Sequence, residues 1–167
     1  QAKKEGKKFQ VYCTETRPLY QGRKTAKELA KAKIPVTYFV DSAARLALKE
    51  ADIFLIGADA ITAEGKVINK IGSELFAEIA SRLEVPLYVC TDSWKFDPET
   101  IFGYEETIEE RSPEEVWPKS PKGIDISNYA FEKISPDLIT GIISELGVSS
   151  VFSFIEEVRK AYPWLLV

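Results

Sequence analysis

Apolar and amphipathic segments alternate over the first ninety residues of the chain. Four apolar runs, rich in β-branched and aromatic residues, have the length of strands: 9–13, 36–40, 52–57 and 87–90. Three segments between them space their apolar residues as amphipathic helices do: 23–33, 43–50 and 73–83. Such alternation with short connections predicts a parallel sheet with helices on both faces.

The pattern changes after Thr91. Residues 92–122 are rich in proline, acids and aromatics, which predicts an irregular excursion with one short helix at 113–116. We expect the acidic run in this excursion to be a solvated surface rather than a site.

The last part of the chain returns to regular patterns. We expect a strand at 124–127, a helix that starts at Ser135-Pro136-Asp137 and ends at Gly147, and a second helix at 149–162. The apolar end, 164–167, is expected to pack on the core or on another subunit.

Composition narrows the class of protein. A length of 167 residues suits one domain with a real core. A net charge of −4 and a pI near 5.1 give no electrostatic reason to expect nucleic-acid or membrane binding. No apolar run reaches about 18 residues, so we expect no membrane span and a cytoplasmic location.

Histidine is absent, which removes the commonest general base and metal ligand. Catalytic triads with histidine and imidazole zinc sites are excluded within this chain. Cys13 and Cys90 end apolar runs and are expected to be small buried residues, so we expect no metal and no cofactor. The chain also lacks methionine and begins at Gln1, which indicates the C-terminal part of a longer protein.

The stretch 52–72 is the strongest candidate for chemistry. Its strand delivers Asp59 into a loop that is closed by Gly65, and Asn69 and Lys70 precede a helix that opens at Gly72-Ser73. In open α/β sheets, ligands bind outside the carboxyl ends of the strands. A carboxylate, an amide, an ammonium group and the N–H groups of a helix start could together bind a small phosphorylated ligand.

Other polar side chains follow the remaining predicted strands: Thr14, Glu15, Arg17, Gln21, Asp41 and Thr91. The guanidinium of Arg17 suits phosphate, and Gln21, like Asn69, can hydrogen-bond sugar hydroxyls. Asp41 with Ser42 is also a plausible N-cap for the helix at 43–50.

Each candidate also has a purely structural interpretation. Asp59 could cap a turn, Arg17 could pair with Glu15 or Asp41, and Lys70 could be simply exposed. The three tryptophans are expected to be packing or interface residues: Trp94, Trp117 and Trp164. No dinucleotide-binding or Walker A glycine motif is present.

Several segments together resemble one family: TETRPLYQGRKTAKELAKAKIPV, VDSAARLALKEADIFLIGADAIT, GKVINKIGS and ISPDLITGIISELG. The family comprises the α, β and δ subunits of eukaryotic initiation factor 2B and two isomerases, of ribose 1,5-bisphosphate and of methylthioribose 1-phosphate. The match covers most of residues 9–148, and its TETRP, GAD and NKIG elements look most similar to archaeal ribose-1,5-bisphosphate isomerase.

The resemblance implies an α/β, Rossmann-like three-layer domain with a mostly parallel sheet flanked by helices. In the family this domain follows a helical N-terminal domain, which this chain lacks. The resemblance makes Asp59 a catalytic acid/base and places Asn69, Lys70, Arg17 and Gln21 on the substrate. The family's catalytic cysteine lies upstream of the TETRP motif and has no counterpart here.

Two departures from the family pattern stand out. The usual NPAFDVTP stretch reads NYAFEKISP, with Tyr129 for proline, Glu132 for aspartate and one extra residue before Pro136. The segment after Gly147 looks more like the regulatory subunits than like the isomerases.

The sequence is therefore consistent with two functions. One is an aldose–ketose isomerase of a phosphorylated pentose, in which burial would raise the pKa of Asp59 for acid catalysis. The other is a non-catalytic regulatory subunit that binds partners, including initiation factor 2, and a sugar phosphate or nucleotide. Retention of Asp59, Asn69 and Lys70 favours the isomerase. Both functions predict a homo-oligomer, and the composition is compatible with an archaeal thermophile.

Overall fold

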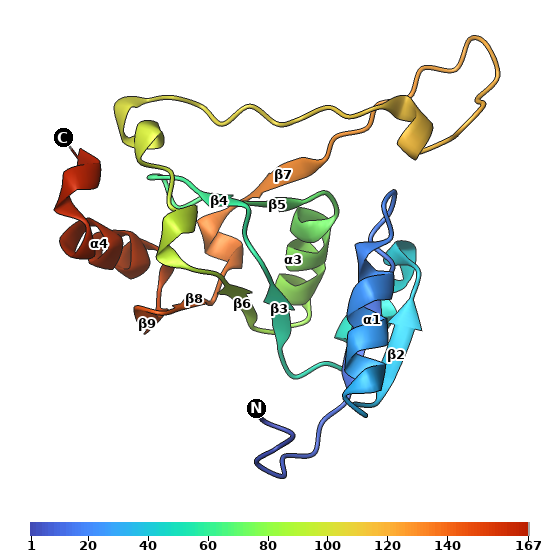
Figure 1. Ribbon diagram of the computed structural model, residues 1–167, viewed down its shortest axis with the longest axis horizontal. Helices are drawn as coiled ribbons and strands as arrows, with labels where there is room; N and C mark the ends of the chain where they lie inside the picture. The colour runs from blue at the N-terminus through green and yellow to red at the C-terminus, as the bar shows by residue number, and fades with distance from the viewer. Residues whose placement is uncertain (167) are drawn as a thin grey trace. The chain divides into compact units, whose positions relative to one another are not determined.

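The computed structural model describes residues 1–166 and shows a mixed α/β protein (Figure 1). Its internal contacts group into two compact units. Unit 1 comprises Gln1–Ala51 and Ser112–Ile126, and unit 2 comprises Asp52–Arg111 and Ser127–Val167. Among the described residues, none of the helices combines the length and the apolar character that crossing a membrane requires.

Unit 1 is built on two parallel strands, β1 (Val11–Thr14) and β2 (Val36–Phe39). Parallel strands need a crossover connection, and helix α1 (Gln21–Lys31) supplies it. The unit also contains α2 (Ala44–Leu48) and the 3-10 turns η1 (Asp41–Ala43) and η4 (Pro113–Glu115). These elements confirm the strands, the helices and the short helix near residue 113 that the sequence predicts here.

Unit 2 contains a four-stranded sheet in the order β3-β6-β8-β9. Its strands are β3 (Phe54–Ile56), β6 (Leu87–Cys90), β8 (Gly141–Ser144) and β9 (Gly147–Ser149). The first three are parallel, and β9 turns back antiparallel on β8. Its 3-10 turns are η2 (Ser93–Lys95), η3 (Pro98–Phe102), η5 (Pro136–Leu138) and η6 (Pro163–Leu166).

A second sheet of unit 2 is antiparallel throughout, in the order β4-β5-β7 (Figure 1). Its strands are β4 (Ala60–Ile61), β5 (Val67–Lys70) and β7 (Phe131–Ile134). The expected loop after Asp59 is thus a hairpin. The α/β class is confirmed, but the described sheets pair strands in both directions, so a mostly parallel sheet is not what they form.

Two helices cover the core of unit 2, α3 (Ser73–Arg82) and α4 (Val151–Ala161). Phe154 and Val158 of α4 are fully buried in one apolar cluster with Val89 of β6 and Ile142 of β8. The cluster explains the helical spacing of apolar residues in α4, whose N-cap is Ser150. In the apolar C-terminal segment, Leu165 packs against this core, and Val167 lies outside the described residues.

Two predicted elements are wrong. Residues 135–146 are not a helix: after η5 the chain forms β8, because the β-branched run pairs with β6, where Thr140 N–H donates to Leu87 O at 2.8 Å. Residues 124–127 form no strand, and the strand of this region is β7. Strand pairing between distant segments, which local pattern does not reveal, decides both cases.

Candidate functional site

The β4–β5 hairpin holds Asp59 and Asn69 beside each other. Ala60 pairs with Ile68 in the antiparallel register, and Asp59 and Asn69 are the chain neighbours of that pair. The Asp59 N–H donates to Ile68 O at 2.8 Å, which fixes the backbone of Asp59 onto β5. The Asp59 side chain is exposed, so the burial expected from the sequence is not present. Asp59 and Asn69, ten residues apart in sequence, therefore lie opposite each other on adjoining backbone segments.

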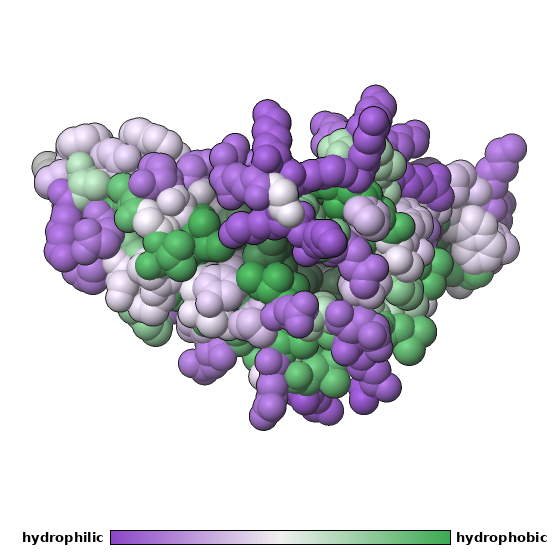
Figure 2. All heavy atoms as spheres, turned by 90° about the horizontal axis from the view of Figure 1, so that it is seen from below, coloured by the Kyte–Doolittle hydropathy of each residue, from purple (hydrophilic) through white to green (hydrophobic). Residues whose placement is uncertain are grey.

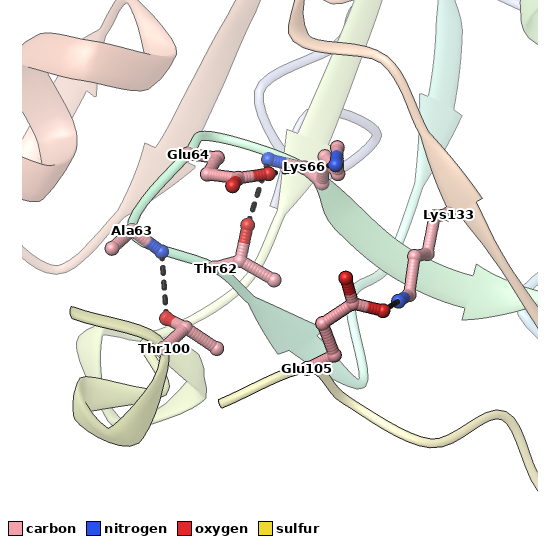
Figure 3. Close-up of polar contacts among 7 residues, drawn as sticks. All are labelled: Thr62, Ala63, Glu64, Lys66, Thr100, Glu105 and Lys133. Atoms are coloured by element: carbon pink, nitrogen blue, oxygen red, sulfur yellow. Dashed lines mark hydrogen bonds and ion pairs between the residues drawn. The ribbon is translucent and has the colours of Figure 1, made fainter. Parts of the chain in front are cut away.

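The tip of this hairpin is held from two sides (Figure 3). Ala63 N–H donates to Thr100 Oγ1 at 2.8 Å, and Thr62 Oγ1 accepts the Lys66 N–H at 3.2 Å. Gly65 has a φ of +84°, and an added Cβ would lie 3.0 Å from Val151 Cγ1 of α4. The loop that separates Asp59 from Asn69 is thus a packed turn rather than an open one.

Asn69 is tied to the start of α3, whereas Lys70 lies elsewhere. Asn69 Nδ2 donates to Ser73 Oγ at 2.9 Å, and Ser73 Oγ donates to Lys70 O at 2.6 Å. The Lys70 ammonium lies 5.8 Å from the ring centroid of Phe131, its partner in β7. Successive residues of a strand point to opposite faces, so Asn69 and Lys70 leave β5 on different sides.

The start of α3 is not an open anion site. Glu132 of β7 reaches the N-terminus of the helix, where its Oε1 accepts the Glu74 N–H at 2.6 Å. Burial raises the pKa of the Glu132 carboxyl above its ordinary value, while hydrogen bonds from the backbone at Gly72, Ser73 and Glu74 oppose that rise. The expectation of unpaired N–H groups for a ligand is corrected, because a side chain of the same unit occupies them.

Arg17 lies in a loop of unit 1 that is fixed by a carboxylate. Asp41 accepts the backbone N–H groups of Thr16 and Arg17 instead of capping the following helix. The Arg17 guanidinium donates to the Tyr20 hydroxyl at 2.6 Å and to the carbonyl of Val116 at 2.8 Å. Arg17 and Asp41 therefore interact through the backbone of Arg17, and the expected ion pair is replaced by this arrangement.

Gln21 is the first residue of α1 and is exposed. Tyr20 before it has a φ of 58°, and the Arg23 guanidinium lies 3.7 Å from the centroid of its ring. Gly22 sits so close to β1 that a Cβ would lie 1.7 Å from the carbonyl oxygen of Thr14. The RPLYQG segment is thus a tight turn that brings Arg17 and Gln21 to the same end of unit 1.

Sequence reasoning missed a lysine in the segment that pairs with β4. Turn η2 ends at Lys95, and the next residue, Phe96, forms a parallel bridge with Ile61 of β4. The Asp97 N–H donates to Ile61 O at 2.9 Å. A cation thus follows β6 and lies beside the strand that Asp59 precedes. The signal in the sequence was its place just after a predicted strand, in SWKF.

A second missed group fixes the turn after β6. Glu145 accepts the N–H of Ser93 at 3.0 Å and also its hydroxyl, which lies 3.2 Å from the Tyr162 hydroxyl. The hydrogen bond from Ser93 lowers the pKa of the Glu145 carboxyl below its usual range. Ser93 is buried, and the contacts join the carboxyl ends of β6 and β8.

The remaining candidates play structural parts. Thr14 ends β1, and Thr91 N–H donates to Ile143 O at 3.0 Å. Trp94 and Trp164 each lie against Tyr162, with ring centroids 5.1 and 5.4 Å from it. Both tryptophans are nevertheless more than 60% exposed, so they pack on Tyr162 at the surface and not in the core.

Neither cysteine is fully buried, which corrects the expectation for both. Cys13 is partly buried, and this burial raises the pKa of its thiol, whereas Cys90 at the end of β6 is exposed. Both are free thiols. Within residues 1–166, no group of three or more acids or thiols is placed to hold a metal ion.

Comparisons with known proteins agree with one another. The model of the initiation factor 2 subunit family matches residues 1–151. Ribose 1,5-bisphosphate isomerase of Thermococcus kodakarensis is 43% identical over 97% of this chain and 52% of its own length. Methylthioribose-1-phosphate isomerase of Maridesulfovibrio salexigens is 40% identical over 86% of the chain and 44% of its own.

Solved structures show the same kinship. The δ subunit of translation initiation factor eIF-2B from A. fulgidus superposes with a TM-score of 0.85 at 31% identity, covering 95% of this chain and 49% of its own. The 5-methylthioribose 1-phosphate isomerase of Pyrococcus horikoshii gives 0.82 at 27% identity, covering 96% and 48%. This chain spans about half the length of these relatives, and it belongs to the initiation factor 2 subunit family.

Proposed function

We propose that the full-length protein is a sugar-phosphate aldose–ketose isomerase whose substrate is ribose 1,5-bisphosphate. The observation that carries this proposal is the hairpin that holds Asp59 beside Asn69. The ribose 1,5-bisphosphate isomerases among the relatives, from 43 to 46% identical to this chain in three archaea, support the choice of substrate.

The reaction itself calls for an acid/base group. Opening the ring breaks the bond from C1 to the ring oxygen, which gains a proton, while one hydrogen moves from C2 to C1. The hydroxyl at C2 gives up its proton and becomes the carbonyl of the ketose. Asp59 is proposed to carry protons between these oxygens, a role that contributes about 10²–10⁴-fold to the rate of such reactions. A bound sugar would cover the exposed carboxylate and exclude water from it.

The remaining residues are assigned to binding. Asn69 is proposed to hydrogen-bond the sugar hydroxyls, and Arg17 and Gln21 to bind a phosphate, since both lie at the end of β1 in unit 1. Lys70 leaves β5 on the side opposite to Asn69, and it is proposed as a cation for a phosphate on the strength of the family resemblance alone. Lys95 joins it, because the bridge between Phe96 and Ile61 brings η2 next to the Asp59 strand.

Finer expectations about the whole protein belong to the same proposal. A Rossmann-like three-layer arrangement is supported by the parallel pairs β1–β2, β3–β6 and β6–β8. A homo-oligomer is supported by large apolar side chains at the surface, including Trp94, Phe102 and Tyr104, each at least 66% exposed. Figure 2 shows hydrophobic residues at the surface, among hydrophilic ones, on the face that it draws. We also expect a cytoplasmic location and an archaeal, thermophilic source.

The test uses the full-length protein. It is incubated with ribose 1,5-bisphosphate, and separately with methylthioribose 1-phosphate, while NMR follows ketose formation. Asp59→Asn should lower kcat by about 10²-fold or more. Asp52→Asn, which changes an exposed aspartate seven residues earlier, is the matched control and should keep full activity. Turnover that survives in Asp59→Asn would overturn the assigned role.

A second function is favoured by one observation, the TM-score of 0.85 with the δ subunit of eIF-2B. In that case the protein would be a non-catalytic regulatory subunit that binds a sugar phosphate or nucleotide and assembles with initiation factor 2. Saturable binding of ribose 1,5-bisphosphate without turnover, together with capture of initiation factor 2, would establish it and exclude the isomerase.

A further inference from the structure

A network of side chains joins β5, β7 and the first turn of α3. Asn69 of β5 and Glu132 of β7 are partners in the antiparallel register, so their side chains lie on the same face of the sheet. Both reach the start of α3: Glu132 accepts the Glu74 N–H, and Asn69 donates to Ser73 Oγ. The helix start is therefore fixed to two neighbouring strands at once (Figure 1).

The hydroxyl of Ser73 determines how the Asn69 amide is turned. A serine hydroxyl has one proton, and Ser73 gives it to the carbonyl oxygen of Lys70 at 2.6 Å. It can then only accept from Asn69, so Asn69 must present its NH₂ group to Ser73, at 2.9 Å. The carbonyl oxygen of the Asn69 amide is thereby left to accept a hydrogen bond from a ligand.

Glu132 does more than an ordinary cap would. Helices usually take their cap from a Ser, Thr, Asp or Asn at the N-cap position, but Gly72 stands there, with a φ of 98°. The cap comes instead from β7, so it sets where the helix start lies relative to the sheet. Its carboxylate is kept partly buried, which raises its pKa. The burial of this carboxylate costs some stability, and in return the position of Ser73 is fixed.

We propose that Ser73 and Glu132 are positioning residues of this site, which orient the Asn69 amide so that its oxygen accepts a hydroxyl of the sugar. This inference rests on the proposed isomerase function. Neither residue touches the substrate: Glu132 places the first turn of α3, and Ser73 passes that placement to Asn69. This positioning role explains why a polar residue, Ser73, occupies a buried position, at which it is only 8% exposed.

The test compares variants of the full-length protein. Ser73→Ala removes the acceptor of Asn69 without touching the bonds of Glu132, and Ser73→Thr restores a hydroxyl. Glu132→Gln weakens the cap, and Glu78→Gln, an exposed glutamate of the same helix, is the matched control. We expect KM for ribose 1,5-bisphosphate to rise about fivefold in Ser73→Ala, the effect of one hydrogen bond, and to recover in Ser73→Thr. Glu132→Gln should raise KM as well, whereas Glu78→Gln should not.

A spectroscopic readout separates this inference from the proposed function. The side-chain NH₂ signals of Asn69, assigned by ¹⁵N NMR, should shift and exchange faster with water in Ser73→Ala than in the wild type. If the wild type does not turn over sugar phosphates but the signals shift, the isomerase proposal fails and the positioning network stands. Unchanged Asn69 signals and an unchanged KM in Ser73→Ala would overturn the network, whatever the activity of the wild type.

Discussion

Asp41 holds the backbone of Arg17: its Oδ2 accepts the Arg17 N–H at 2.7 Å, while Oδ1 accepts the neighbouring Thr16 N–H at 2.8 Å. The parallel register of β1 and β2 ends at the pair Thr14–Phe39, so the segments that follow the two strands lie at one end of unit 1. A carboxylate after β2 thereby shapes the loop after β1. The loop is fixed although Thr16 has an unfavourable φ of 60°.

Removal of this carboxylate should loosen the loop. Asp41→Ala leaves two partly buried N–H groups without their acceptor, so we expect the free energy of unfolding to fall by about 1–3 kcal/mol. Urea denaturation of the full-length protein measures the change. Asp125→Ala, at an exposed position of the same unit, should alter stability by less than about 0.5 kcal/mol. Equal stability of the two variants would show that Asp41 does not fix the loop.

Gly22 makes the same loop sensitive to the smallest substitution. In Gly22→Ala the new Cβ would lie 1.7 Å from the backbone oxygen of Thr14, so β1 and α1 must move apart. Overpacking of this kind costs about 1–3 kcal/mol or more. We expect a lower melting temperature and weaker phosphate binding. Gly57→Ala is the control, because a Cβ there meets nothing within 4 Å and should leave both unchanged.

The local pattern of the sequence predicts the elements that depend on local forces. The parallel strands β1, β2, β3 and β6 and helices α1, α3 and α4 follow from apolar runs and helical spacing. The elements that it misses are those made by partners distant in sequence. β8 forms because β6 lies beside it, and β5 forms between β4 and β7, so residues expected in a loop became a strand.

The same distinction between local pattern and distant partners applies to the candidate site. The sequence predicts that Asp59, Asn69 and Lys70 lie together, because Asp59 follows a strand and the resemblance places all three at one site; the structure brings only Asp59 and Asn69 opposite each other. The role of Glu132 could not be predicted from the sequence. Glu132 reaches the start of α3 from β7 and accepts the N–H of Glu74, which is 58 residues away in sequence. Sequence shows that a helix start has unpaired N–H groups, but only the fold shows what binds them.

Gly65 links the hairpin that carries Asp59 to the core. Gly65→Ala would combine a φ of +84° with a contact of 3.0 Å to Val151, whereas Gly103→Ala has nearly the same φ, +86°, and open space. The backbone term should cost about 1–2 kcal/mol in both variants. We expect Gly65→Ala to lose more stability than Gly103→Ala by chemical denaturation, and to lower kcat. Identical losses would mean that the packing of the hairpin tip contributes nothing.

The raised pKa of Glu132 gives a pH dependence of stability whose sign is fixed. The folded protein binds this proton more tightly than the unfolded chain does, so between the ordinary glutamate pKa and the raised one the folded state carries more of it. The free energy of unfolding must therefore fall as pH rises from the ordinary glutamate pKa to the raised pKa of Glu132. Glu132→Gln removes the titrating group and with it this dependence.

The measurement is the free energy of unfolding of the wild type and of Glu132→Gln, by urea denaturation from about pH 4 to pH 8. Other carboxylates titrate in both proteins, so their effects cancel in the difference. The free energy of unfolding of the wild type, minus that of Glu132→Gln, should increase as pH falls. This difference should be smallest, or most negative, at the highest pH measured. A difference that changes in the opposite direction would mean that the hydrogen bonds from the start of α3, rather than burial, dominate the ionisation of Glu132.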